Sequence, residues 1–270
     1  MSKTVDAATI AFAHRLAEVS GAVIRPYFRA PIDVDAKAAM INGKPIFDPV
    51  TEADKGAERA IRAVIEAERP DDGILGEEYG EKPSKNGLSW ILDPVDGTRA
   101  FINGRHEWGT LISLEREGVP VLGMIDQPWL GERFFSVNGA SVMHEKGKVS
   151  PLKVRACAAL SDAMLCATTP EAFPKLGPGA WDAFGRVEDK VKLTRWGGDC
   201  YIFATLVMGF CDLIVESLSK RWDVSALIPL VEAAGGVITD WQGHEPGNGG
   251  GVVAAGDRRV HEQALKLLNP

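Results

Sequence analysis

The sequence predicts an α/β (α+β) protein in which helices cover a mixed sheet, and three observations support this prediction. Near the N-terminus, residues 5–28 carry apolar side chains at helical spacing. In the middle of the chain, the apolar runs 108–115 and 119–126 are separated by a glycine-containing turn, as in a hairpin. In the second half, strand-like and helix-like segments alternate, which is typical of helices packed on a sheet.

Two helices and five strands are expected in the first half. The second helix begins at Thr51, or at an acid beside it, because these residue types cap helix N-termini, and it ends near Arg69, before Pro70. The expected strands are 73–78, 90–92, 108–115, 119–126 and 133–137.

The second half follows a polar, glycine-bearing connection at 139–150, which is the expected boundary between the halves. We therefore expect an N-terminal half, residues 1–145, and a C-terminal half, residues 146–270, that form one compact unit. The expected strands are 163–167, 192–195, 211–215, 237–239 and 252–255, and the expected helices are 181–187, 199–208, 223–234 and 258–268.

Composition narrows the class of protein. The net charge of -7 argues against a broad surface for nucleic acid or for an anionic membrane. Four cysteines without a CxxC spacing indicate reduced thiols, as in a cytoplasmic protein. The N-terminus lacks the pattern of a signal peptide, and apolar runs fall short of the ~18 residues that span a membrane. We expect a globular cytoplasmic protein without a nucleic-acid or membrane partner.

The stretch WILDPVDGTRAF, residues 90–101, is the strongest candidate for a functional site. An apolar strand runs into Asp93, and Pro94 cannot continue the strand ladder. A second acid, Asp96, is followed by Gly97 and Thr98, which suit a sharp turn into a short helix. Clustered carboxylates bind hard cations such as Mg²⁺, and free N–H groups at a helix start suit phosphate. Taken alone, the same string also fits an ordinary surface turn.

Other acids repeat this placement at strand ends or helix starts. Glu77 and Glu78 end the strand 73–78, Asp48 precedes the second helix, and Asp223 lies in the first turn of a later helix. Helix capping is a sufficient explanation for some of them. In open α/β folds, however, ligands bind at such ends, so the repetition indicates one shared site.

Four segments together resemble the inositol monophosphatase family of magnesium-dependent phosphomonoesterases. They are FDPVTEAD (47–54), GEE (76–78), DPVDGTRAF (93–101) and WDVSALIPLVEAAGG (222–236), and the resemblance covers nearly the whole chain. It implies a layered αβαβα sandwich, hydrolysis of a small phosphate monoester by metal-activated water, and a homodimer. Such chemistry needs two cations that offset charge on the entering and leaving oxygens, which suits converging carboxylates.

The resemblance also implies the metal ligands, for two to three Mg²⁺ ions. Glu77, Asp93 and the backbone carbonyl of Val95 would hold one ion, and Asp93, Asp96 and Asp223 a second. A third ion would rest mainly on Glu77, with Glu78 nearby.

Other residues are implied to handle water and phosphate. Thr98 with Asp48 would orient and deprotonate the attacking water, and the N–H groups of Gly97 and Thr98 would receive phosphate oxygens. Relatives place a lysine near the third ion, and here both Lys37 and Lys44 are candidates.

Substrate choice depends on two acids in the second half. Glu216 matches a position that contacts a substrate hydroxyl in the family, and Asp199, within GGDCY, falls where inositol-type members carry small neutral residues. An acid there favours a cationic substrate, and GGDCY and WGTLISL (108–114) resemble the histidinol-phosphate phosphatase branch. A helix N-cap without a ligand is the alternative explanation for Asp199.

We therefore expect hydrolysis of L-histidinol phosphate, a step of histidine biosynthesis. The alternatives are inositol 1-phosphate, a broader range that includes fructose 1,6-bisphosphate and adenosine 3',5'-bisphosphate, and a non-enzymatic metal-binding regulatory protein on the same fold.

Overall fold

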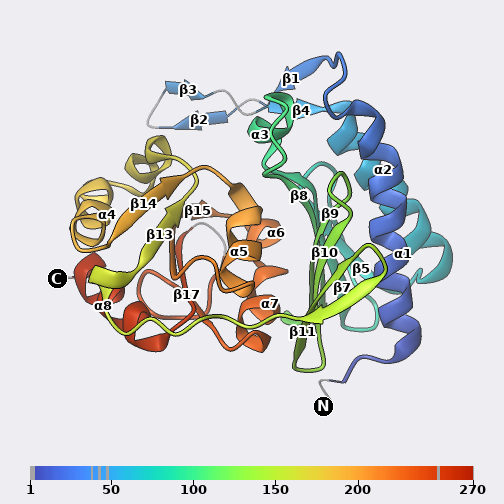
Figure 1. Cartoon of the computed structure of the whole chain (residues 1–270). Helices are drawn as coiled ribbons and strands as arrows, with labels where there is room; N and C mark the ends of the chain where they lie inside the picture. The colour runs from blue at the N-terminus through green and yellow to red at the C-terminus, as the bar shows by residue number, and fades with distance from the viewer. Residues whose placement is uncertain (1–3, 38, 42–43, 47–48, 248–249, 270) are drawn as a thin grey trace.

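The computed structural model describes residues 4–37, 39–41, 44–46, 49–247 and 250–269. It has five layers, which confirms the predicted αβαβα sandwich (Figure 1). Two long helices cover one face of a large sheet, a middle layer of helices separates it from a smaller sheet, and two helices cover the far face. The helices, in layer order, are α1 (Ala7–Ile24) and α2 (Glu52–Glu68), then α5 (Asp199–Val207), α6 (Arg221–Val224) and α7 (Leu227–Ala233), then α4 (Ala180–Glu188) and α8 (Arg258–Leu268).

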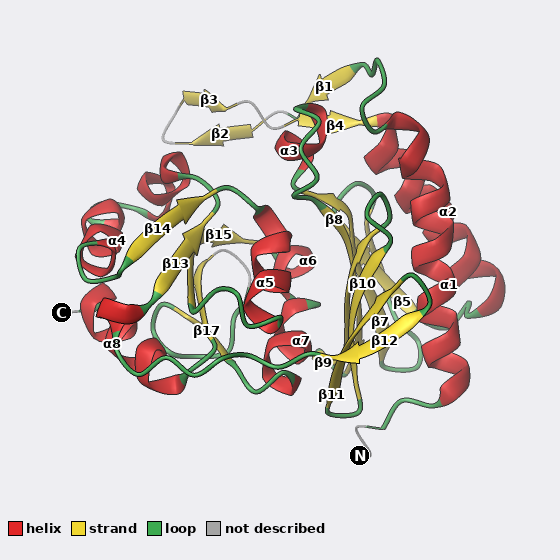
Figure 2. Cartoon of the chain, in the orientation of Figure 1, coloured by secondary structure: helices red, strands yellow, loops and turns green. Residues whose placement is uncertain are grey.

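The large sheet has eight strands in the order β12-β11-β10-β9-β8-β7-β5-β6. Figure 2 shows its strands in yellow, between α1 and α2 on one side and the middle helices on the other. Its neighbours pair antiparallel, except for the parallel pair β5 and β7. The bounds are β5 (Gly73–Gly76), β6 (Gly80–Lys82), β7 (Leu88–Asp96), β8 (Gly109–Arg116), β9 (Val119–Gln127), β10 (Glu132–Val137), β11 (Ala140–Glu145) and β12 (Lys148–Pro151).

The smaller sheet has five strands in the order β14-β13-β15-β17-β16 and mixes parallel and antiparallel pairs. Its strands are β13 (Met164–Ala167), β14 (Leu193–Trp196), β15 (Leu213–Ser219), β16 (Val237–Asp240) and β17 (Gly250–Ala255). Short elements complete the chain: η1 (Arg25–Tyr27), β1 (Val34–Ala36), β2 (Ala39–Ile41), β3 (Lys44–Ile46), β4 (Pro49–Thr51), α3 (Thr98–Ile102), η2 (Leu160–Asp162) and η3 (Pro170–Leu176).

Two local expectations were wrong. The connection expected at 139–150 is instead the hairpin of β11 and β12, so the large sheet continues to Pro151 and the predicted division at 145/146 falls inside that hairpin. Most of its side chains are only partly buried or exposed, and such strands lack the apolar runs used to predict strands. The helix expected at 223–234 is divided into α6 and α7, because Pro229 cannot donate to the carbonyl of Ser225, four residues earlier.

Buried apolar side chains fill each interface between layers. The core between the two sheets joins strand residues such as Phe134 and Ile214 to helix residues such as Phe203 and Leu230. A second core lies between the smaller sheet and α4 and α8, and a third between the large sheet and α1 and α2. The middle helices therefore bury side chains against both sheets, which fixes the two halves relative to each other.

Helix α2 begins as the sequence predicts. The Thr51 hydroxyl accepts the N–H of Ala53, and the Asp54 carboxylate accepts the N–H of Thr51, which is a capping box. The segment Ala7–Tyr27 is the one helical stretch among the described residues that is long and apolar enough to cross a membrane. Its apolar face packs on α2 and the large sheet, as in the core helix of a globular protein.

The central core should be sensitive to loss of a large side chain. Phe134 is fully buried there, so Phe134→Ala is expected to lower the free energy of unfolding by about 3 to 5 kcal/mol. Phe210 is 64% exposed, and Phe210→Ala should change it by less than about 0.5 kcal/mol. Urea unfolding of both variants measures the difference, and equal losses would contradict the assignment of this core.

Candidate active site

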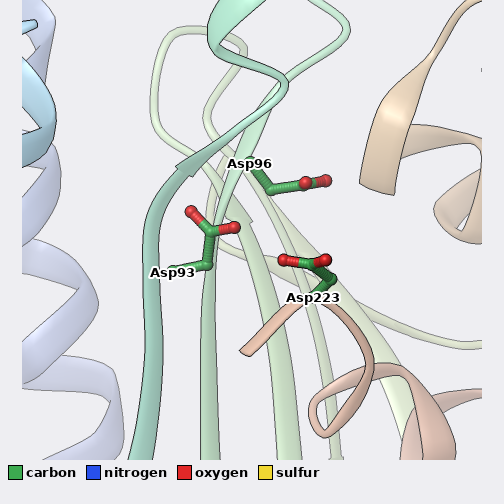
Figure 3. A group of neighbouring side chains, drawn as sticks. All are labelled: Asp93, Asp96 and Asp223. Carbon is green, nitrogen blue, oxygen red and sulfur yellow. The ribbon is translucent and has the colours of Figure 1, made fainter. Parts of the chain in front are cut away.

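Three aspartates from distant parts of the chain meet between the layers. Asp93 and Asp96 project from the end of β7 and Asp223 from α6, and their side chains point toward one another (Figure 3). One carboxylate oxygen from each lies within 4.8 Å of those of the other two. The register of β7 against β8 shifts between Asp93 and Asp96, where Pro94 interrupts the ladder. This irregularity places both acids of one strand at a single point.

Backbone donors orient each of these carboxylates. Asp93 accepts the N–H of Val95 at 3.1 Å, and Asp223 accepts the N–H of Lys220 at 2.7 Å. Asp96 accepts the N–H of Cys200, in the first turn of α5, at 2.6 Å. Charge-assisted bonds of this kind fix the side-chain orientations, so the cluster is preorganised.

Burial and mutual repulsion dominate the electrostatics of the cluster. Burial, followed by the charges of Glu77 and Asp96, raises the pKa of Asp93 well above its usual value. Burial, then Asp199 and Asp223, raises the pKa of Asp96 in the same way, and burial and Glu77 raise the pKa of Asp223 to about 7 although the Lys220 N–H lowers it. Buried like charges that repel each other are stabilised by a bound cation.

The two glutamates after β5 are paired with a lysine. Lys37 places its Nζ 2.6 Å from an oxygen of Glu77 and 2.6 Å from an oxygen of Glu78. Burial lowers the pKa of Lys37, but the two glutamates outweigh burial and raise it. Glu58, which is fully buried on α2, accepts the N–H of Glu78 at 2.8 Å and so holds this turn. Of the two candidate lysines, Lys37 thus reaches the acids, and the side chain of Lys44 lies outside the described residues.

The turn after Asp96 has the conformation that its glycine indicates. Gly97 has φ +91°, and a Cβ there would lie 2.9 Å from the carbonyl oxygen of Glu107. The Thr98 hydroxyl lies 3.0 Å from the carbonyl oxygen of Val95 and 3.2 Å from Oδ1 of Asp54. Asp48, the predicted partner of Thr98, lies outside the described residues.

A cavity of about 760 Å³ opens beside the cluster and contains the two candidate specificity residues. Its lining includes Glu77, Asp96, Asp199, Glu216 and Asp223. This size suits a small polar metabolite. The structure therefore brings the two candidate substrate-binding acids to one cavity with three of the candidate metal ligands.

Thr168 orients Glu216 through two hydrogen bonds. Its Oε1 accepts the N–H of Thr168 at 2.7 Å and the hydroxyl of the same residue at 2.8 Å. Burial raises the pKa of Glu216 to about 8, although the Thr168 hydrogen bonds lower it. A protonated or cation-paired carboxyl group is favoured at this position.

Asp199 is not a helix N-cap. Gly198 occupies that position, and Asp199 is the first residue of α5. Asp199 itself has φ +42°, a left-handed conformation that non-glycine residues rarely adopt. Burial and the charge of Glu107 raise the pKa of Asp199 to about 6, against the opposing charges of Arg99 and Arg105. Capping therefore does not explain this acid.

Sequence reasoning missed several residues of the site. Asp54 lies within hydrogen-bond distance of Thr98. In the sequence, however, the capping box of α2 is a sufficient reason for an acid at this position, so nothing marks Asp54 as a site residue. Thr168 follows β13 in a segment without a motif, and its contact with Glu216 connects it to the site. Arg105 and Glu107 form an ion pair on the cavity wall, in a loop where charged residues are common.

Comparison with known proteins identifies a family. The model of the Inositol monophosphatase family matches residues 6–270. The chain is 42% identical to the chloroplastic bifunctional phosphatase IMPL2 of Arabidopsis thaliana over 269 residues, 96% of this chain and 74% of that protein. It is 37% identical to a histidinol-phosphatase of Chlorobaculum parvum over 241 residues, 89% of each chain.

A solved structure agrees with this assignment. An inositol monophosphatase from Zymomonas mobilis superposes with a TM-score of 0.84 at 43% sequence identity. The match covers 98% of this chain and all of that one.

The raised pKa of Glu216 predicts how stability depends on pH. Because the folded pKa, about 8, exceeds the ordinary value of 4.5, this group stabilises the fold fully below pH 4.5, and the contribution is lost as the pH rises toward 8. Glu216→Gln keeps the acceptor for Thr168 but does not ionise. Its free energy of unfolding should therefore rise relative to that of the wild type by about 1 to 3 kcal/mol as the pH increases from 5 to 8. Urea unfolding at both pH values measures this change.

The exposed Glu171 provides a control, because Glu171→Gln should follow the wild type at both pH values. A constant difference between Glu216→Gln and the wild type would contradict the prediction.

Proposed function

Because the chain belongs to the inositol monophosphatase family, we propose that this phosphoric monoester hydrolase acts on L-histidinol phosphate and uses Mg²⁺. The observation that carries the choice of substrate is Asp199, an acid that lines the cavity, lies one residue after the N-cap of α5 and has a raised pKa of about 6. Glu216 adds a second acid to the same cavity. Two acids of this kind favour a ligand with a positive charge.

The donor set fits a hard divalent cation. Asp93, Asp96 and Asp223 offer carboxylate oxygens at mutual distances within 4.8 Å, and oxygen is the ligand atom that Mg²⁺ prefers. These three residues, with Glu77, would hold the ions. When bound, such ions offset the charge of the phosphate group and lower the pKa of a water molecule.

Thr98 and Asp54 would handle the proton of the attacking water. When the Thr98 hydroxyl donates its one proton to Asp54 rather than to the carbonyl of Val95, its oxygen can accept a hydrogen bond from water. Burial raises the pKa of Asp54 above the usual value, although its bonds to Thr51 lower it, so this carboxylate can take up a proton at the end of the relay. The N–H groups of Gly97 and Thr98 would receive phosphate oxygens.

The alcohol part of the substrate would lie against Asp199 and Glu216. Histidinol phosphate carries an ammonium group and an imidazole, whereas inositol phosphates carry hydroxyl groups alone. A cation near these two carboxylates would favour their ionised forms and replace the water lost on burial. The relationship to a histidinol-phosphatase at 37% identity supports the same choice.

Inositol 1-phosphate is the second candidate substrate. It is favoured by the likeness, at 43% identity, to a solved structure named an inositol monophosphatase. Both substrates present a phosphate group to the aspartate cluster, so the candidates differ only in the contacts made by the alcohol part.

A substrate panel tests the proposal. We expect the highest kcat/KM for histidinol phosphate, with lower values for inositol 1-phosphate, fructose 1,6-bisphosphate and adenosine 3',5'-bisphosphate. Phosphate release should require Mg²⁺ and stop with EDTA, because the aspartate cluster would lose the cations that offset its charge. A preference for inositol 1-phosphate would favour the second candidate, and turnover that persists in EDTA would contradict the metal assignment.

Neutralising Asp199 should separate the two substrates. We expect Asp199→Asn to lower kcat/KM for histidinol phosphate about 10- to 100-fold, because a charge-assisted bond is lost. The loss on inositol 1-phosphate should be much smaller. Asn tolerates the left-handed backbone, so the change tests charge rather than folding.

Asp182, in the first turn of α4, is the matched control, because it does not line the cavity of the cluster. Asp182→Asn should leave both rates unchanged. Equal losses on the two substrates for Asp199→Asn would remove the basis for choosing histidinol phosphate.

A further inference from the structure

A buried polar network joins the large sheet to helix α6. The carboxylate of Glu115, on β8, accepts from Nε of Arg221 at 2.6 Å and from the hydroxyl of Ser225 at 2.7 Å. The Ser225 hydroxyl also lies 2.9 Å from that of Ser113, and Arg221 donates to the carbonyl of Gly118 at 2.5 Å. Glu115 is 5% exposed, so its bonds to Ser225 and Arg221 are largely shielded from water, whereas the bond of Arg221 to Gly118 lies at the surface.

The network connects the two parts of the chain that supply the aspartate cluster. Strand β8 pairs with β7, which carries Asp93 and Asp96. On the other side, Arg221 and Ser225 lie two residues before and two residues after Asp223. The network thus contacts α6 on both sides of Asp223 and connects the helix to the sheet that carries Asp93 and Asp96.

Helix α6 needs such external support. It has only four residues, and so short a helix does not hold its conformation on its own. The Asp223 carboxylate is bonded to the N–H of Lys220, which fixes the side chain relative to its own helix and not relative to β7. The position of the helix therefore depends on its contacts with β7, β15 and α7, and the Glu115 network adds polar contacts to the large sheet.

We propose that Glu115 and Arg221 are positioning residues that hold Asp223 against Asp93 and Asp96 and thereby set the affinity for the divalent cation. This inference rests on the proposed function, because it takes Asp223 as a metal ligand. Partners that orient metal ligands typically change affinity by about 10- to 100-fold when they are removed. A buried ion pair adds little net stability compared with apolar side chains, so a role in geometry accounts for it better than a role in stability alone.

The chain contains a matched ion pair that lacks this connection. Arg133 on β10 bonds Asp126 on β9 at 2.7 Å, and the side-chain exposures of this pair are 17% and 6%. Those of Arg221 and Glu115 are 17% and 7%. Arg133 also contacts His14 of α1, so this pair supports the outer helical layer rather than α6.

A comparison of the two ion pairs separates an effect on the position of Asp223 from an effect on the stability of the fold. Full-length wild type, Arg221→Met and Arg133→Met are stripped of metal with a chelator, and Mn²⁺ binding is measured by electron paramagnetic resonance together with the melting temperature. We expect Arg221→Met to weaken Mn²⁺ binding about tenfold or more. Arg133→Met should stay within about twofold of the wild type while losing a similar amount of melting temperature. Arg221→Lys, which keeps a cation facing Glu115, should restore part of the affinity.

Smaller changes test the same point if Arg221→Met fails to fold. Ser225→Ala removes one bond to Glu115 and should weaken Mn²⁺ binding, whereas Ser141→Ala, which removes a buried bond to α7, should not. Equal affinities for the serine variants, or for the two arginine variants, would overturn the positioning role. A wild type that binds no Mn²⁺ would instead overturn the proposed function.

Discussion

The repulsion among carboxylates buried between two sheets is the constraint on which the site depends. Asp93, Asp96 and Asp223 are held near each other although burial and neighbouring charges raise the pKa of each. Each is fixed by a backbone N–H and cannot turn away without losing that bond. The fold therefore maintains an arrangement that is unfavourable without a cation and favourable with one.

This arrangement requires the layered fold as a whole. Two of the aspartates come from the large sheet and one from the middle helices, and the N–H that orients Asp96 belongs to α5. The middle layer is packed on both sheets, so its position is set by apolar burial on two sides. The site consequently exists only when both halves are folded together, and a change in the packing of the middle layer should be transmitted to the cluster.

Much of the fold and of the site was predictable from the sequence, for identifiable reasons. The apolar runs marked the central strands, and Asp93, Asp96 and Asp223 were recognised because each ends a strand or begins a helix. What was missed depends on tertiary contacts or on weak patterns. Asp54 was explained by capping, and Thr168 has no motif. Strands β11 and β12 lack a continuous apolar run because most of their side chains are not fully buried.

Asp199, proposed to contact the alcohol part of the substrate, lies against the turn at Gly97, which is proposed to bind phosphate. Residues 197–199 all have positive φ, so the chain turns sharply before α5 and brings Asp199 toward Gly97. A Cβ on Gly97 would lie 3.1 Å from Cβ of Asp199, which leaves no room for a larger residue. The unusual backbone of Asp199 thus accompanies the close approach of this acid to the turn at Gly97. Because the two turns are in contact, a substitution that enlarges the residue at either position should displace both turns, whereas Asp199→Asn keeps the size of the side chain and changes only its charge.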